Sequence, residues 1–191
     1  MIRILISTST VLWVIFMMGV AAPAPAADIQ GVYFSDRLHI ESHHLTIRGT
    51  GLFRYLGLFH AYVGALYVDE PSPTADVLGD TAKRLELEYF HRIKGEDFAA
   101  ATRKLLTRNL APDTFARLKN DIDRFNDLYE DVQPGDRYAL TYIPGVGTEL
   151  ALNGRPVDRV KGVELATALF SMWIGRQPMN ASFKRQLLGL Q

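Results

Sequence analysis

The chain has no cysteine among its 191 residues. This absence excludes thiol nucleophiles, disulfide bonds and metal sites built from cysteine. The fold must therefore be stabilised by a hydrophobic core without covalent cross-links. Hydrophobic residues make up 48% of the chain and charged residues 22%, which is typical of a globular protein. The length fits one domain with a substantial core.

An excess of either charge is also missing, since 21 basic residues stand against 21 acidic ones. Without a basic stripe, nucleic acid is not expected as a partner. There is no glycine-rich loop between a strand and a helix, because Gly145-Val146-Gly147 lies between two predicted strands and should be a turn. A serine nucleophile elbow is missing as well. These absences exclude the common nucleotide-binding and serine-hydrolase sites, and no cofactor is expected.

The first 26 residues have the features of a secretory signal peptide. Arg3 supplies a positive start, Val11 to Val20 an apolar segment, and Ala24-Pro25-Ala26 a small-residue cleavage site. Cleavage there would leave a domain of residues 27–191, exported to a bacterial periplasm, with no stable membrane span. An uncleaved membrane anchor is the alternative, but the apolar run is short, and small residues and prolines follow it.

Alternating apolar and polar residues predict strands in the first half of the chain. Residues 44–49 form one such segment, and the aromatic run 52–68 predicts two strands that turn near Gly57. Residues 71–80 are predicted to be a loop. The segment 83–92 then alternates between apolar residues and glutamate, which predicts a further strand.

The spacing of apolar residues then changes to three and four, which indicates helices. Residues 95–110 and 113–129 are predicted to be amphipathic helices separated by Ala111-Pro112. Asp113 is expected to cap the start of the second helix.

The C-terminal third predicts a hairpin or three-stranded meander followed by two helices. Turns are expected at residues 133–136 and at Asn153-Gly154, a helix over residues 163–174, and a last helix capped by Asn180. Strands and helices thus fall in separate blocks, which indicates an α+β fold with a largely antiparallel sheet. One face of the sheet would hold the helices, and a ligand would lie on the other face or in the gap beneath them.

Five motifs occur in a defined order. They are GTGLFR at residues 49–54, YVGALYVDEP at 62–71, GDRYALTYIPGVGTELALNG at 135–154, WIGRQP at 173–178 and LLG at 187–189. This pattern resembles the chalcone isomerase-like proteins, most closely their exported bacterial branch, over roughly residues 31–189. The resemblance implies an open-faced β-sandwich, in which helices are layered on one face of a large antiparallel sheet. It also implies one of two behaviours, because plant enzymes of this family close a flavanone ring and plastid relatives bind fatty acids without known catalysis.

The resemblance also assigns candidate site residues. Arg54 matches the arginine with which the enzymes hold a substrate phenolate, and Tyr62 stands where they have a threonine. Phe98, Leu105 and Ala166 lie near positions where they have a tyrosine, an asparagine and a serine or threonine. Because most of this polar set is apolar here, binding is favoured over catalysis, and no catalytic residue is assigned.

Arg54 is a candidate site residue even without the resemblance, because the apolar run around it contains no acidic partner before Asp69. Such an arginine either reaches solvent at a turn or binds an acidic ligand. The nearby His60 is a third candidate for ligand binding, although a partly exposed strand histidine is the simpler interpretation. Tyr62 has a comparable alternative as a core aromatic residue whose hydroxyl bonds to the backbone.

The leading hypothesis is a non-enzymatic periplasmic protein that binds a small amphiphilic anion. A fatty acid is the favoured ligand, with its carboxylate on Arg54 and Tyr62. One alternative is an intramolecular lyase or isomerase acting on an unknown substrate. The other is a protein-interaction module, which should have no cavity but a large exposed apolar patch.

The histidine-rich segment HIESHH raises the question of a metal site. His39, Glu41 and His43 alternate, so they would share a strand face and could bind zinc. His44 would point away, and no fourth ligand is evident. No metal site is therefore expected.

Overall fold

The computed structural model describes residues 26–55, 57–69 and 76–190. The segment predicted to be a signal peptide and the first part of the loop predicted at residues 71–80 lie outside these ranges. Within them, no helix is long and apolar enough to cross a membrane. The described chain folds as two sheets and four helices.

In both sheets, each strand pairs with the strand that precedes or follows it in the sequence. A two-stranded hairpin is formed by β1 (Ala26–Ile29) and β2 (Val32–Ser35). The large sheet is antiparallel throughout, with neighbouring strands β3 (Arg37–Ile40), β4 (His43–Tyr55), β5 (Phe59–Asp69), β6 (Lys83–Tyr89), β7 (Arg137–Ile143), β8 (Gly147–Leu152) and β9 (Arg155–Val160). This arrangement confirms the predicted α+β class and the antiparallel sheet.

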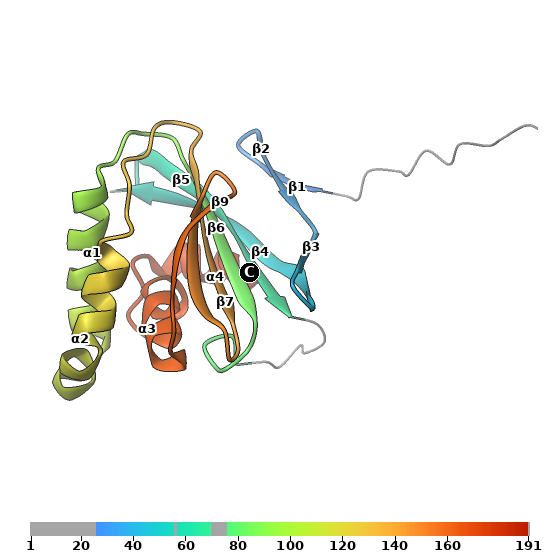
Figure 1. The fold of residues 1–191 in the computed structure, drawn as a ribbon. Coiled ribbons are helices and arrows are strands. Elements are labelled where there is room, and N and C mark those ends of the chain that lie inside the picture. The colour runs from blue at the N-terminus through green and yellow to red at the C-terminus, as the bar shows by residue number, and fades with distance from the viewer. Residues whose placement is uncertain (1–25, 56, 70–75, 191) are drawn as a thin grey trace, which may run out of the picture.

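The helices lie on one side of the large sheet, and the β1–β2 hairpin lies on the other (Figure 1). They are α1 (Gly95–Asn109), α2 (Pro112–Asn126), α3 (Val163–Ile174) and α4 (Ala181–Leu187). The sheet therefore buries apolar residues on both faces. Leu85, Leu87 and Tyr89 of β6 pack toward the helices as their alternation predicted, while Phe34 of β2 belongs to a smaller core on the opposite face.

Strand β4 differs from the sequence prediction. The segments predicted to be separate strands form one strand of 13 residues, with register shifts at Ile47/Gly49 and Phe53/Arg54. The glycines bring α4 close to this strand: a Cβ on Gly51 would lie 2.9 Å from the Phe183 ring, and one on Gly49 would clash with the backbone of α4. The predicted turn at Gly57 is confirmed, and this glycine has a φ of +74°.

Most helix boundaries match the prediction, but α2 ends at Asn126, three residues before the predicted end, and its start also differs. Ala111 is the N-cap residue and Pro112 the first helical residue, so Asp113 lies within the first turn and does not cap it. A proline at this position is favoured because the backbone N–H it lacks would have no helical partner. The predicted cap of α4 is confirmed, since the Asn180 side chain accepts a hydrogen bond of 2.8 Å from the backbone N–H of Phe183.

Candidate functional site

A cavity of about 170 Å³ lies between the large sheet and helices α1 and α3. Strands β5 to β8 supply one wall, and α1 and α3 supply the other (Figure 1). Most of the lining is apolar, with Leu87 on the sheet side and Leu105 and Met172 on the helix side. Asp97 and Ala101 of α1 also line it and are exposed, which places an opening of the cavity beside the first half of α1.

A stack of aromatic rings continues this wall toward α4. The ring of Tyr62 lies parallel to that of Phe53, with their centroids 4.7 Å apart, and contacts Phe183 and Tyr89 edge to face. Phe98 of α1 joins the set through Tyr89, at 5.2 Å between centroids. These contacts fix the Tyr62 ring in one orientation and leave its hydroxyl as the polar end of the stack.

Some polar atoms in the cavity wall have good hydrogen-bond partners, and others have a weak partner or none. The Tyr138 hydroxyl donates to the Glu130 carbonyl at 2.8 Å, and Thr102 Oγ1 and the Tyr129 hydroxyl lie 3.0 Å apart within hydrogen-bond reach. The Tyr62 hydroxyl has only the Met179 thioether as acceptor, at 3.2 Å. The indole Nε1–H of Trp173 is buried and has no hydrogen-bond partner.

The tyrosines of the wall are neutral at physiological pH. Burial raises the pKa of Tyr62, Tyr89 and Tyr129 well above the ordinary value, and that of Tyr138 to about 12. Among the described residues that line the cavity there is no lysine, arginine or histidine, and Asp97 is the one charged group. The site can therefore offer hydrogen-bond donors and apolar surface, but no buried counter-charge.

The predicted ligand-binding residues lie in different environments. Tyr62 is buried in the cavity wall, as a site residue should be. Arg54 is exposed at the end of β4, opposite His60 of β5, and is not among the lining residues. The residue of β4 that faces Tyr62 is Phe53. Contacts of Arg54 and His60 with a ligand remain predictions.

His60 lies instead on a shallow hollow of the surface. This hollow is also lined by Leu58, Phe59 and His91, and the three apolar side chains at the tip of the β4–β5 hairpin, Tyr55, Leu58 and Phe59, are exposed. The hollow is separate from the cavity beneath α1, since the two share no lining residue. His60 is therefore close to Tyr62 along the chain but does not line the cavity, and its role in ligand binding stays a prediction.

Two of the three apolar replacements inferred from the family resemblance do line the cavity. They are Phe98 and Leu105 of α1, whereas Ala166 is fully buried outside the lining. The polar lining residues Thr102 and Trp173 were not predicted. Helical spacing could have revealed Thr102, because it lies one turn after Phe98 and one turn before Leu105.

The histidine-rich segment does not assemble as predicted. A turn between β3 and β4 separates His39 from His43, so the side chain that meets His39 is His44, with their Nδ1 atoms 3.3 Å apart. His43 instead pairs with Asp69, at 2.7 Å between Nδ1 and Oδ2. The predicted common face of His39, Glu41 and His43 is therefore wrong, because the two histidines lie on different strands. Within the described ranges, no group of three metal-ligating side chains is found.

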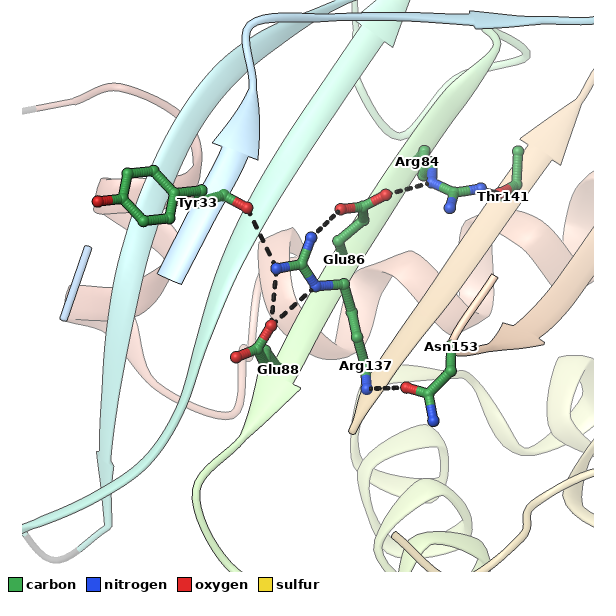
Figure 2. Close-up of polar contacts among 7 residues, drawn as sticks. All are labelled: Tyr33, Arg84, Glu86, Glu88, Arg137, Thr141 and Asn153. Atoms are coloured by element: carbon green, nitrogen blue, oxygen red, sulfur yellow. Dashed lines mark hydrogen bonds and ion pairs between the residues drawn. The ribbon is translucent and has the colours of Figure 1, made fainter. Parts of the chain in front are cut away.

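A polar network on the opposite face of the sheet ties the β1–β2 hairpin to β6 and β7. Figure 2 shows Arg137 of β7 between Glu86 and Glu88 of β6, at 3.2 and 2.7 Å. The same guanidinium donates to the Tyr33 carbonyl at 3.2 Å and lies over the Phe34 ring. Because each charge in this group has a partner, we interpret it as a structural tie between the two sheets.

Comparisons with known proteins were made on sequence and on structure. A family model described as chalcone isomerase-like matches residues 26–189. The fold is similar to that of a fatty-acid binding protein from Arabidopsis thaliana, with a TM-score of 0.63 and 19% sequence identity. That match covers 86% of this chain and 96% of the plant chain. A search of curated proteins finds no match.

Proposed function

The chain belongs to the chalcone isomerase-like family, and we propose that it uses this fold to bind a small amphiphilic molecule without transforming it. The observation that carries the proposal is the apolar cavity between the sheet and helices α1 and α3. The structural similarity to a plant fatty-acid binding protein supports a fatty acid or related lipid as the ligand class.

The cavity volume limits what is bound inside. At about 170 Å³ it is close to that of engineered apolar cavities, of about 150 Å³, that hold a benzene molecule. A ring or a short alkyl segment therefore fits without rearrangement. Longer tails require movement of the two lining methionines, Met172 and Met179, whose unbranched side chains adapt readily to new shapes.

Binding without catalysis agrees with the chemistry of the wall. An isomerase of this family's kind needs groups that stabilise charge as an enolate develops. The lining tyrosines stay neutral because burial raises the pKa of Tyr62 and Tyr129, and the described lining offers no cation. Arg54, which is exposed, remains a proposed contact for a charged group of the ligand that stays outside the cavity.

We also propose that the protein is exported to the periplasm. The support is in the sequence, where Arg3, the apolar segment from Val11 to Val20 and the small-residue site Ala24-Pro25-Ala26 occur in the order of a signal peptide. N-terminal sequencing of the protein recovered from a periplasmic extract tests this. A start near Ala27 supports export with cleavage, whereas a chain that retains Met1 in the membrane fraction contradicts it.

Native mass spectrometry with added decanoic acid tests ligand binding directly. Ala101→Trp places a large ring at the opening of the cavity, and Ala100→Trp makes the same change at an adjacent exposed position of α1 outside the lining. We expect uptake by the parent and by Ala100→Trp, and at least tenfold weaker uptake by Ala101→Trp. No uptake by the parent, or equal uptake by both variants, would contradict binding in this cavity.

A further inference from the structure

We infer that the part of the ligand inside the cavity carries an uncharged hydrogen-bond acceptor, held by the indole N–H of Trp173 and the hydroxyl of Tyr62. The inference rests on the proposed function and concerns the polar end of the same ligand. It assigns a subsite to two residues, of which Trp173 was not predicted from the sequence. An ester or ketone carbonyl, or an un-ionised carboxylic acid, has the required chemistry.

Trp173 supplies the first observation. Its side chain lines the cavity, the residue is only 9% exposed, and Nε1 has no hydrogen-bond partner. Buried donors are almost always paired, because an unpaired one loses its hydration without compensation. A donor left open in the wall of a cavity is therefore matched to an acceptor that arrives with the ligand.

Tyr62 supplies the second donor. Its hydroxyl donates to Met179 Sδ at 3.2 Å, and a thioether is a weak acceptor. Both side chains line the same cavity, and Trp173 is the hydrogen-bonding neighbour that lowers the pKa of Tyr62 against the larger rise caused by burial, although its Nε1 does not reach the hydroxyl in hydrogen-bond geometry. The two donors are thus close together, and one oxygen with two lone pairs can accept from both. Met179, half-buried on the α3–α4 connection, would give way to that oxygen.

The charges around this subsite decide the form of the acceptor. The described lining contains no basic side chain, and Asp97 at the opening is acidic, so a buried carboxylate would have no counter-charge. An isolated anion is strongly disfavoured in such surroundings, whereas a neutral oxygen loses little if it gains two hydrogen bonds. A fatty acid would therefore enter head first only as the un-ionised acid or as an ester.

Three probes of matched size test the inference on the isolated protein. They are acetophenone, ethylbenzene and benzoate, which share one ring and differ in the acceptor. The ring suits the cavity volume. We expect acetophenone to bind about tenfold more tightly than ethylbenzene at pH 7, because of the two added hydrogen bonds. Benzoate should bind more weakly than either neutral probe.

A spectroscopic measurement identifies the donor. In protein labelled with ¹⁵N-tryptophan, the indole signal of Trp173, assigned with Trp173→Phe, should move downfield with acetophenone but not with ethylbenzene. Trp173→Phe and Tyr62→Phe should each reduce the preference for acetophenone about threefold or more, while ethylbenzene still binds. Lys104→Ala is the control and should leave both affinities unchanged, since Lys104 is an exposed residue of α1 outside the lining.

The outcomes separate the two claims. Equal binding of acetophenone and ethylbenzene, an unmoved indole signal, or tight binding of benzoate would overturn the subsite while leaving the cavity as a binding site. Loss of the acetophenone preference in Lys104→Ala would also overturn it. Failure of all three probes to bind would contradict the proposed function and the subsite together.

Discussion

Arg137 joins two acidic side chains and the β1–β2 hairpin through one guanidinium group. We expect Arg137→Ala to lower the free energy of unfolding by about 3 kcal/mol, because it leaves Glu86, which is almost fully buried, without this partner. Urea denaturation measures the change. The control is Arg155→Ala, whose pair with Glu130 is exposed and should cost about 0.5 kcal/mol. Equal effects of the two substitutions would show that the network does not stabilise the fold.

Single residues were the hardest features to predict from the sequence. Tyr62 lies in the cavity wall, and its contact with a ligand, which was inferred from the family resemblance, stays a prediction. Arg54 was predicted to bind the same carboxylate as Tyr62; a register shift at Phe53/Arg54 puts Phe53 opposite Tyr62, and Arg54 does not line the cavity. A local shift of one residue reverses the face of a side chain, and nothing in the sequence marks it.

At the scale of elements, helix α4 packs closely on strand β4 because Gly49 and Gly51 of β4 have no side chains at the contact. We expect Gly49→Ala to lower the free energy of unfolding by about 2 to 3 kcal/mol, since the new methyl group would meet the backbone of α4 at Gln186. Thermal and urea denaturation measure the loss. The neighbouring change Thr50→Ala should cost less than about 1 kcal/mol. A Gly49→Ala protein as stable as the parent would show that α4 shifts without cost.

Elements were predicted more reliably than residues. The boundaries of α3 and the cap of α4 agreed with the structure, because apolar spacing and capping residues are local signals. The wrong N-cap of α2 was a local error, since Pro112 is the first helical residue, whereas the error in β4 occurred where a tertiary contact overrode a local signal. Gly49 and Gly51 resemble strand breakers, yet they continue β4 because a helix packs against them.

For the whole molecule, the buried Lys83 makes stability depend on pH. Its ammonium lies over the rings of Tyr142 and Phe170, and burial lowers its pKa from 10.5 to about 8, partly offset by Asp76 and Asp80. Between these pH values the unfolded chain binds a proton that the native protein has released. The free energy of unfolding should therefore rise with pH from about 8 to 9, by about 1 kcal/mol.

Above about pH 9 the trend should reverse. Burial raises the pKa of several tyrosines, among them Tyr62 and Tyr89, so they ionise more readily in the unfolded chain and stability falls. Urea denaturation at pH 7, 8, 9 and 10 measures the profile. Lys83→Met should remove the rise between pH 8 and 9. A rise that persists in Lys83→Met would assign it to another group.

The fold class was predictable from local patterns, whereas the gap beneath the helices was only one of two predicted places for a ligand, and the residues that line the cavity were mostly not predicted. The blocks of strands and helices are visible in local periodicity, which indicates an α+β fold. The cavity is formed by residues far apart in the chain, such as Tyr62 of β5, Leu105 of α1 and Trp173 of α3. Their meeting depends on how the helices pack on the sheet, which single-sequence patterns do not specify.

The central claim is that the cavity beneath α1 and α3 binds the apolar part of a small amphiphile. A crystal structure of the protein grown with decanoic acid tests it most directly. We expect ligand density between the sheet and α1, with its apolar part against Leu87 and Leu105. An empty cavity in crystals of protein shown to be loaded, or ligand density only at the exposed β4–β5 tip, would contradict the account.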